Sequence, residues 1–316
     1  MLPFTIIKNK KIPFLPFYHL VTDEIPRHIK FLYKPFGTVA FEKHLDFYLK
    51  HYKPVEQIPD FNKNGYFLLS FDDGLREIYD IVVPILKRKG VRAVIFVNSE
   101  FVDNRDLMFR YKASLLVDRL INKSLTSAEK QFLITAFKSH GLNFSDIKRS
   151  ILNIDFLHRA IIDNLLENFE IDIPQYLREQ KPYMTLNQLK SLEKYGFWIG
   201  MHSASHPDFK QLTVDEQLSE INAGLEWHRT NFPNQPNYFA FPFSDDGLKK
   251  TFIESFGDLG IPNSFGTAGI KKDICRNHYQ RFPVEDYSGS INKIVRGELA
   301  YQLMLRIFGK NKVIHP

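Results

Sequence analysis

Short apolar runs alternate along much of the chain with longer segments of helical period. Residues 66–71 (YFLLSF) and 91–97 (VRAVIFV) have the pattern of buried strands. Between them, residues 75–89 have the period of a helix, and Gly90 supplies a favoured C-terminal stop. This strand–helix–strand order predicts a mainly parallel sheet with helices packed outside it.

The second half of the chain repeats the same order. Helices are predicted over residues 185–196 and 213–231, because each range begins with a threonine followed three residues later by Gln or Glu, the capping-box pattern. Strands are predicted directly after them, over residues 197–201 (FWIGM) and 238–243 (YFAFPF). Together with the first half, this pattern predicts an α/β fold.

Residues 102–180 interrupt this order. They contain helical stretches at 114–123, 127–141 and 156–169, and no convincing strand lies between them. We interpret the segment as a helical insertion near one rim of the sheet, within a single domain that spans residues 1–316.

Composition narrows the class of protein. The 44% hydrophobic and 25% charged residues are ordinary for a soluble globular protein. The net charge is +6, but the basic residues are dispersed, so a nucleic-acid partner is not expected. The single cysteine, Cys275, excludes a disulfide framework and a thiolate metal site. Without a long apolar run or a signal-peptide pattern, neither a transmembrane segment nor export is expected, so the predicted location is the cytoplasm.

Two adjacent acids end the first predicted strand. Neighbouring strand residues point to opposite faces, so Asp72 and Asp73 cannot both continue a buried ladder. They are expected where the chain turns at Gly74, on the edge that carries active sites in parallel α/β folds. Acids there suit metal binding or general-base catalysis, although capping of the helix that begins at Leu75 is an equally good explanation.

Two histidines follow another predicted strand and favour the metal explanation. His202 and His206 lie four residues apart, and a helical turn there would point both imidazoles the same way. Imidazole is a good ligand for zinc and similar ions. One acid and two histidines with open coordination positions are what a hydrolytic metal centre needs.

The two motifs together, SFDDG (70–74) and HSASH (202–206), resemble those of the polysaccharide deacetylases with a NodB homology domain. The resemblance covers residues of about 65 to 290. It implies a distorted (β/α) barrel, one divalent metal ion and removal of acetyl groups from sugars. It also implies that Asp72 is the catalytic base and that Asp73, His202 and His206 bind the metal.

A third motif departs from the family pattern. Where members often have Arg-x-Pro-Tyr, this chain has Ala-Phe-Pro-Phe at 240–243, so the arginine that orients the base is missing. The backbone amide of Phe243 is the candidate oxyanion donor. Arg281, on a late predicted strand, is the candidate replacement for the arginine, although pairing with Glu285 or Asp286 at the surface explains it equally well.

The catalytic acid is less well defined by sequence. Family members have a histidine near the C-terminal end of the barrel, for which His315 is the weak candidate. His19, in FYHLV, resembles a stretch near the start of some members, but a core or rim histidine is the simpler interpretation.

These features predict a metal-dependent hydrolase that deacetylates an N-acetylated sugar in a glycan or glycan precursor. The metal is expected to be zinc, with cobalt, nickel and manganese as alternatives. Two other hypotheses remain open: a metal-dependent hydrolase of a non-sugar amide, and a catalytically impaired glycan-binding module that keeps the metal. The sequence does not specify the sugar or the oligomeric state.

Overall fold

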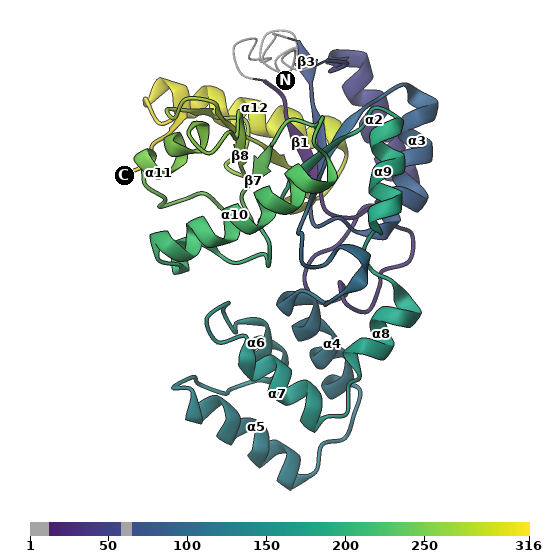
Figure 1. The fold of residues 1–316 in the computed structure, drawn as a ribbon, viewed down its shortest axis with the longest axis vertical. Helices are drawn as coiled ribbons and strands as arrows, with labels where there is room; N and C mark the ends of the chain where they lie inside the picture. Colours follow the sequence, from purple (N-terminus) through teal and green to yellow (C-terminus); the bar gives the residue numbers. More distant parts are fainter. Residues whose placement is uncertain (1–12, 58–64) are drawn as a thin grey trace. The chain divides into compact units, whose positions relative to one another are not determined.

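The computed structural model describes residues 13–57 and 65–316, which form two compact units (Figure 1). Unit 2 consists of Glu24–Pro35 and Asn104–Pro182, and unit 1 contains the rest of the described chain. Each unit is described separately below.

Unit 1 is built on an eight-stranded sheet in which every paired strand is parallel. The strands follow the order β10-β8-β7-β6-β5-β4-β1-β11. Their bounds are β1 Pro16–Tyr18, β4 Leu69–Phe71, β5 Ala93–Val97, β6 Trp198–Met201, β7 Phe239–Ala240, β8 Ser264–Gly266, β10 His278–Gln280 and β11 Phe282–Pro283. Two two-stranded sheets accompany it, one of β2 (Lys53–Pro54) with β3 (Tyr66–Phe67), the other of β9 (Lys272–Asp273) with β12 (Lys312–Val313).

The two edges of the main sheet meet at one residue. The edge strands β10 and β11 are consecutive in the chain, and only Arg281 separates them. The N–H of Arg281 donates to the carbonyl of Gly266 at the end of β8, and the N–H of Phe282 donates to the carbonyl of Leu15 before β1. One extended segment therefore joins both edges and closes the sheet into a distorted (β/α) barrel, the fold class that the sequence predicted.

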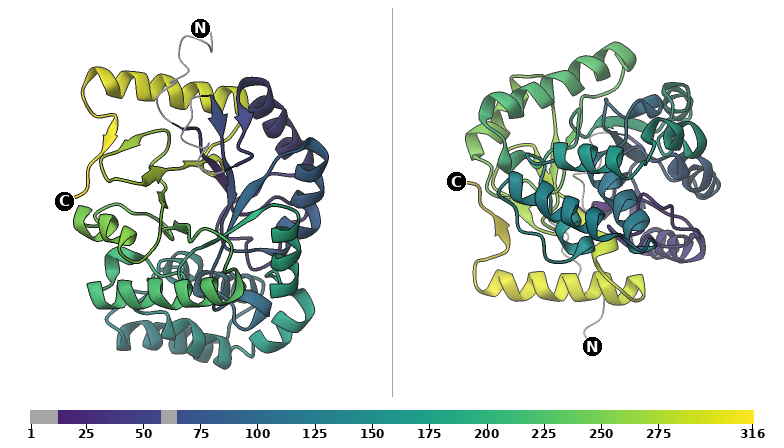
Figure 2. Two further views of the ribbon diagram at one scale, coloured as in Figure 1. Left: turned by 45° about the horizontal axis from the view of Figure 1, so that its top comes forward. Right: turned by 90° about the horizontal axis from the view of Figure 1, so that it is seen from below.

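Helices surround the barrel, as the two views of Figure 2 show. In unit 1 they are α2 Thr38–His51, α3 Val83–Lys89, α9 Leu186–Lys194, α10 Val214–Asn231, α11 Lys250–Glu254 and α12 Ile291–Ile307, with a π-helical turn at Ile78–Val82 before α3. Thr185 and Thr213 form the predicted capping boxes at the starts of α9 and α10. Gly90 ends α3 in the left-handed conformation, as expected.

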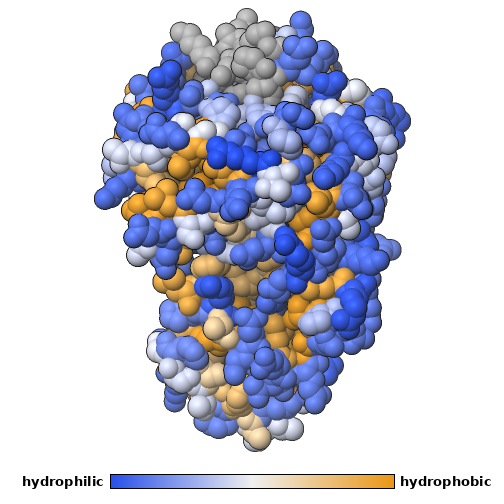
Figure 3. All heavy atoms as spheres, viewed as in Figure 1, coloured by the Kyte–Doolittle hydropathy of each residue, from blue (hydrophilic) through white to orange (hydrophobic). Residues whose placement is uncertain are grey.

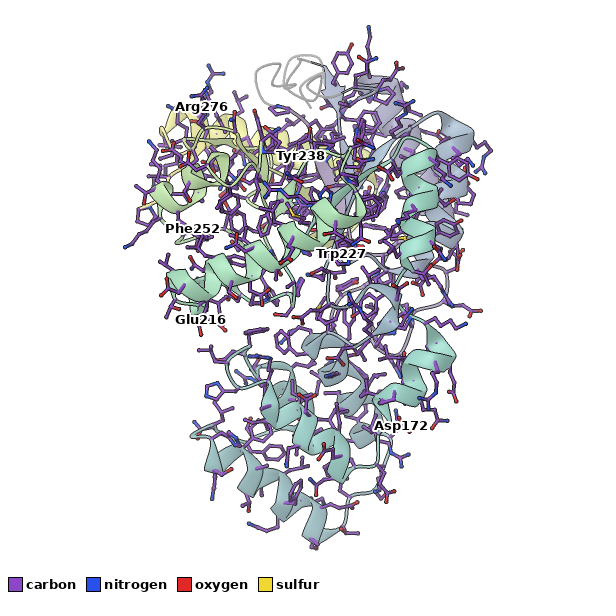
Figure 4. All side chains as sticks on the ribbon, viewed as in Figure 1. Asp172, Glu216, Trp227, Tyr238, Phe252 and Arg276 are labelled. Carbon is purple, nitrogen blue, oxygen red and sulfur yellow. The ribbon has the colours of Figure 1, made fainter. Side chains whose placement is uncertain are left out.

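The alternation of side chains along the strands produces two apolar clusters. Tyr238 and Ala240 point into the barrel, whereas Phe239 between them packs outside, toward α10 and α11. The inner cluster comprises Leu15, Val55, Leu68, Val94, Phe96, Tyr238, Ala240 and Phe265. Tyr238 of this cluster and Phe252 of the outer one are labelled in Figure 4. The barrel interior is thus a packed core, and polar groups gather where the strands end.

Unit 2 is helical, and its described residues contain no strand. Its helices are α4 Phe109–Ile121, α5 Ser127–Ser139, α6 Ile147–Leu152, α7 Ala160–Asn168 and α8 Ile173–Gln180. The early segment 24–35 belongs to this unit, because Arg27 and Lys30 both bind the carboxylate of Asp118 on α4, at 2.8 and 2.9 Å. The interpretation of 102–180 as an insertion into one domain stays a prediction.

Within the described residues, no helix combines the length and the hydrophobicity needed to cross a membrane. Hydrophilic residues cover most of the face shown in Figure 3, with smaller hydrophobic patches between them.

A buried histidine on α2 makes stability depend on pH. His44 is 3% exposed, and its Nδ1 atom lies 2.9 Å from the hydroxyl of Tyr18. Burial lowers the pKa of His44 to about 4. In the unfolded chain the pKa of His44 is about 6.5, so the unfolded state binds a proton at this residue before the folded state does as the pH falls. The free energy of unfolding therefore decreases by roughly 2–3 kcal/mol between pH 7 and 4.5.

The variant His44→Gln keeps a hydrogen-bonding group but has no charge to gain. We expect its free energy of unfolding, measured with urea, to fall less than that of the wild type over this pH range. Equal slopes for the two proteins would contradict the prediction.

Candidate active site

Three predicted site residues, Asp72, Asp73 and His202, lie where strands β4 and β6 end, on either side of β5. Asp72 and Asp73 follow β4, and His202 follows β6. His19 follows β1, whose Tyr18 is in register with Phe71 of β4, so His19 lies beside Asp72 at the same edge. The sheet therefore brings together residues that are more than 100 positions apart in the chain.

A sharp turn separates the two adjacent acids. Asp73 and Gly74 both have positive φ, 69° and 68°. A Cβ atom on Gly74 would lie only 3.0 Å from Cγ1 of Val97, so the turn is both left-handed and tightly packed. As a result Asp72 continues the inward face of β4, while Asp73 turns toward the histidines.

Asp72 forms a two-pronged ion pair with Arg281. Nη1 of Arg281 donates to Oδ1 at 2.6 Å, and Nη2 donates to Oδ2 at 2.8 Å. Nη1 also donates to the hydroxyl of Ser70, at 3.2 Å. Planar forks of this kind are the strongest guanidinium–carboxylate contacts, and they fix the carboxylate plane.

Arg281 is buried between two aromatic rings. It is 1% exposed, and its guanidinium carbon lies 4.3 Å from the ring centre of Phe17 and 5.1 Å from that of Phe96. Burial alone would raise the pKa of Asp72, but Arg281 and then His202 lower it below its usual range. Asp72 is therefore a carboxylate at neutral pH.

Asp73, His202 and His206 bring three ligand atoms together. Oδ1 of Asp73 lies 3.5 Å from Nε2 of His202 and 3.3 Å from Nε2 of His206. Metal–ligand bonds of about 2.0–2.1 Å at tetrahedral angles separate two ligands by about 3.3 Å. One carboxylate oxygen and two imidazole nitrogens at these distances fit a divalent cation such as zinc, with coordination positions left over.

Hydrogen bonding sets the tautomer of His202. Its Nδ1 atom lies 2.8 Å from the carbonyl oxygen of Ala240, which accepts only, so Nδ1–H is the donor and Nε2 carries the lone pair. Burial lowers the pKa of His202 to about 4, which keeps the ring neutral as a metal ligand requires. The pKa of Asp73 is also lowered: burial would raise it, but His206, His19 and His202 together outweigh burial.

The chain between the two histidines is not helical, so the predicted helical turn is wrong. Ser203 and His206 have positive φ, 65° and 60°, and the hydroxyl of Ser203 accepts from the N–H of His206. The carboxylate of Glu220 on α10 accepts from the N–H groups of Ala204 and Ser205. This anchored loop still brings the two imidazole rings to 5.0 Å.

Phe243 adjoins the triad from the loop after β7. Its ring centre lies 4.8 Å from that of His206, and the residue is 44% exposed. Its φ is 54°, and Thr267 donates to its carbonyl at 3.0 Å. Among the described residues its N–H has no hydrogen-bond partner, so this group is available to an external acceptor.

His19 is held by Glu285. Its Nδ1 atom lies 2.6 Å from Oε2 of Glu285, and the N–H groups of His19 and Leu20 donate to the same carboxylate. About 30% of the imidazole side chain is exposed. Burial lowers the pKa of His19, but Glu285 and then Asp73 and Asp72 raise it, with a net value of about 9.

Comparison with known proteins decides the family. The family model described as polysaccharide deacetylase matches residues 62–263, more than half of the chain. The chain belongs to the polysaccharide deacetylase family. No curated protein sequence matches it.

Solved deacetylase structures share the fold of this chain. The Streptococcus pyogenes deacetylase PplD, in complex with acetate, matches with a TM-score of 0.56 at 13% identity, over 92% of this chain and 99% of that one. IcaB from Ammonifex degensii matches with a TM-score of 0.53 at 14% identity, over 92% and 97%. The de-N-acetylase from Aggregatibacter actinomycetemcomitans matches with a TM-score of 0.52 at 14% identity, over 90% and 98%. At these identities the likeness concerns the fold.

The positions of two further residues, His315 and Glu285, were poorly predicted from the sequence. His315 is buried in a separate cluster, where its Nε2 atom lies 3.1 Å from Oδ2 of Asp273. Glu285 was considered only as a surface partner of Arg281, whereas it binds His19. The contact between His19 and Glu285 joins residues 266 positions apart, so no local pattern could predict it. The only sequence signal for His19 was the FYHLV stretch that contains it.

Proposed function

We propose that this protein is a metal-dependent deacetylase that hydrolyses the acetamide group of an N-acetylated sugar in a glycan or glycan precursor. The observation that carries the proposal is the buried Asp72–Arg281 pair beside the Asp73–His202–His206 triad. Asp72 lies next to the metal-ligand triad but is held by Arg281 and is not one of the ligands, so its carboxylate is free to take part in proton transfer.

In this proposal, Asp73, His202 and His206 hold one divalent cation, most simply zinc. When bound, the cation supplies Lewis-acid chemistry by polarising the acetyl carbonyl and making a nearby water more acidic. The family membership and the donor atoms support this assignment.

Asp72 is the proposed general base. Both of its oxygens accept from Arg281, yet each keeps a second lone pair, so the carboxylate can still take a proton. As water attacks the acetyl carbon, its proton passes to Asp72. Arg281 keeps the carboxylate ionised and its plane fixed, so that the lone pair points at the attacking water throughout the reaction.

His19 is the proposed general acid, in place of His315. The contact with Glu285 fixes its ring, and the pKa of about 9 keeps it protonated at neutral pH. When the bond between the acetyl carbon and the sugar nitrogen breaks, His19 gives its proton to that nitrogen. The products are acetate and a free amino sugar.

Phe243 completes the proposed site. Its N–H is the candidate donor to the oxyanion that develops on the acetyl oxygen. Its partly exposed ring beside His206 offers an apolar surface for the acetyl methyl group or a sugar face.

The alternative of an impaired binding module rested on the alanine at position 240 and on the doubtful role of His315 as catalytic acid. Arg281 supplies the missing guanidinium from another strand, so this alanine no longer argues against turnover. A non-sugar amide would use the same groups, and substrate profiling separates it from a glycan.

The direct test combines metal removal with acetate release. Purified protein treated with a chelator is expected to lose release of acetate from N-acetylhexosamine oligosaccharides, and saturating zinc or cobalt should restore it. Unchanged activity without metal would contradict metal dependence. If the restored enzyme cleaves simple acetamides but no sugar substrate, the non-sugar alternative is favoured.

The role of His19 can be tested by changing the leaving group. The variant His19→Asn is expected to lower kcat on the acetamide substrate by roughly 10²-fold or more, since the amine must leave without its acid. Hydrolysis of an aryl acetate, whose leaving group needs no proton, should change far less. Equal losses on both substrates would indicate a structural rather than an acid role.

A further inference from the structure

Four more ligand-type side chains converge elsewhere in unit 1. Asp245 lies in the loop after β7, Asp273 ends β9, His278 begins β10, and His315 lies in the segment after β12. All four are at least nine-tenths buried. The candidate active site uses none of them.

Their facing atoms are spaced like the ligands of one ion. Nε2 of His278 lies 3.0 Å from Oδ2 of Asp245, and Nε2 of His315 lies 3.1 Å from Oδ2 of Asp273. The cross distances are 3.6 Å, from His315 to Asp245, and 3.9 Å, from His278 to Asp273. These values lie around the separation of about 3.3 Å that tetrahedral zinc coordination requires.

In both histidines the Nδ1 atom, on the side of the ring away from the cluster, has a hydrogen-bond partner that orients the ring. Nδ1 of His315 lies 3.2 Å from the carbonyl oxygen of Leu248, which only accepts, so Nδ1 is the donor and Nε2 presents its lone pair to the cluster. Nδ1 of His278 lies 2.8 Å from the hydroxyl of Ser264. Metal-binding histidines usually have such a partner on the other nitrogen.

The carboxylates are held in the same way. Oδ1 of Asp273 accepts from the N–H of Cys275 at 2.8 Å, and Oδ1 of Asp245 accepts from the N–H of Thr267 at 3.2 Å. In each residue the outer oxygen is bonded to the backbone and the inner oxygen faces the cluster. Four convergent donors therefore remain, two nitrogens and two oxygens.

The side-chain amide of Gln280 lies among these four side chains and carries no charge. Nε2 of Gln280 lies 2.6 Å from Oδ2 of Asp245, 2.7 Å from Oδ2 of Asp273 and 3.2 Å from Nε2 of His278. Its Oε1 accepts from the N–H of Ala268, which fixes the amide orientation. A buried pair of carboxylates with a neutral amide still needs positive charge, either from an ion or from protonated histidines.

We propose that Asp245, Asp273, His278 and His315 bind a second divalent cation, zinc by the chemistry of the ligands. With four protein ligands and no open position, the site is of the structural kind, in contrast to the three-ligand triad. Gln280 is not one of the four proposed ligands, and its amide nitrogen donates to the two carboxylates. The ion would link β9, β10 and the loop after β7 to the C-terminal segment.

Metal stoichiometry tests this proposal on the full chain. Chelator-treated wild type titrated with cobalt(II) or zinc is expected to bind two equivalents, and the double variant His202→Gln/His206→Gln is expected to keep one. Adding His315→Gln to that double variant should remove the remaining equivalent. If the double variant binds no metal, or if His315→Gln leaves its stoichiometry unchanged, the proposal is wrong and protonated histidines balance the charge.

A stability readout guards against loss through misfolding. In the double variant, saturating zinc is expected to raise the melting temperature, because the ion binds only the folded state. His315→Gln, near the chain end, should abolish this increase while circular dichroism stays unchanged, and Asp245→Asn should do the same. A zinc-dependent increase that survives in both variants would overturn the assignment.

Discussion

Asp72→Asn is expected to lower kcat for acetate release by roughly 10²–10⁴-fold while the metal content stays unchanged. The side chain keeps its shape but loses the basic lone pair. The loss should fall on kcat rather than on KM, because proton transfer belongs to the transition state. Acetate release, KM and bound metal measured on one preparation check all three expectations.

Asp73→Asn is the matched control, since the two acids are adjacent but contact different partners. It should lose metal as well as activity. If Asp72→Asn also loses metal, Asp72 is a ligand and the two roles are wrongly divided. If Asp72→Asn retains more than a tenth of the wild-type kcat, another group is the base.

Arg281→Met is expected to reduce the free energy of unfolding by about 3–5 kcal/mol and to abolish most activity. The variant leaves the carboxylate of Asp72 buried without a countercharge, which is the costly way to break such a pair. Urea unfolding measures the first effect. Acetate release, assayed at a temperature where the variant remains folded, measures the second.

A double variant separates charge from packing. Asp72→Asn/Arg281→Met removes both partners, so it should unfold less readily than Arg281→Met alone. Arg281→Lys keeps the charge but not the fork, and should recover stability more than activity. Strictly additive losses in the double variant would contradict a direct pair.

The central strands and the ends where the site lies could be predicted, because their signals are local. The alternation of long apolar runs with capped helices predicts that successive strands run parallel. Asp72 and His202 then follow at the same edge. The turn after His202 was predicted wrongly because spacing alone cannot reveal positive φ at Ser203 and His206.

The three-residue strands β1, β8 and β10 were not predicted. β1 has three residues, which is too few for an alternating pattern, and β8 and β10 are equally short. Arg281 was proposed as the partner of Asp72 only by analogy, since the contact joins residues 209 positions apart. Contacts of this range depend on barrel closure, which no local pattern encodes.

The position of Arg281 makes the proposed base, Asp72, dependent on completion of the barrel. This residue joins the last edge strand to the first, and its side chain neutralises Asp72 inside. Because burying this carboxylate without its countercharge is costly, we expect the ion pair and the closed seam to form together. Changes that loosen this seam should inactivate the protein before they unfold it.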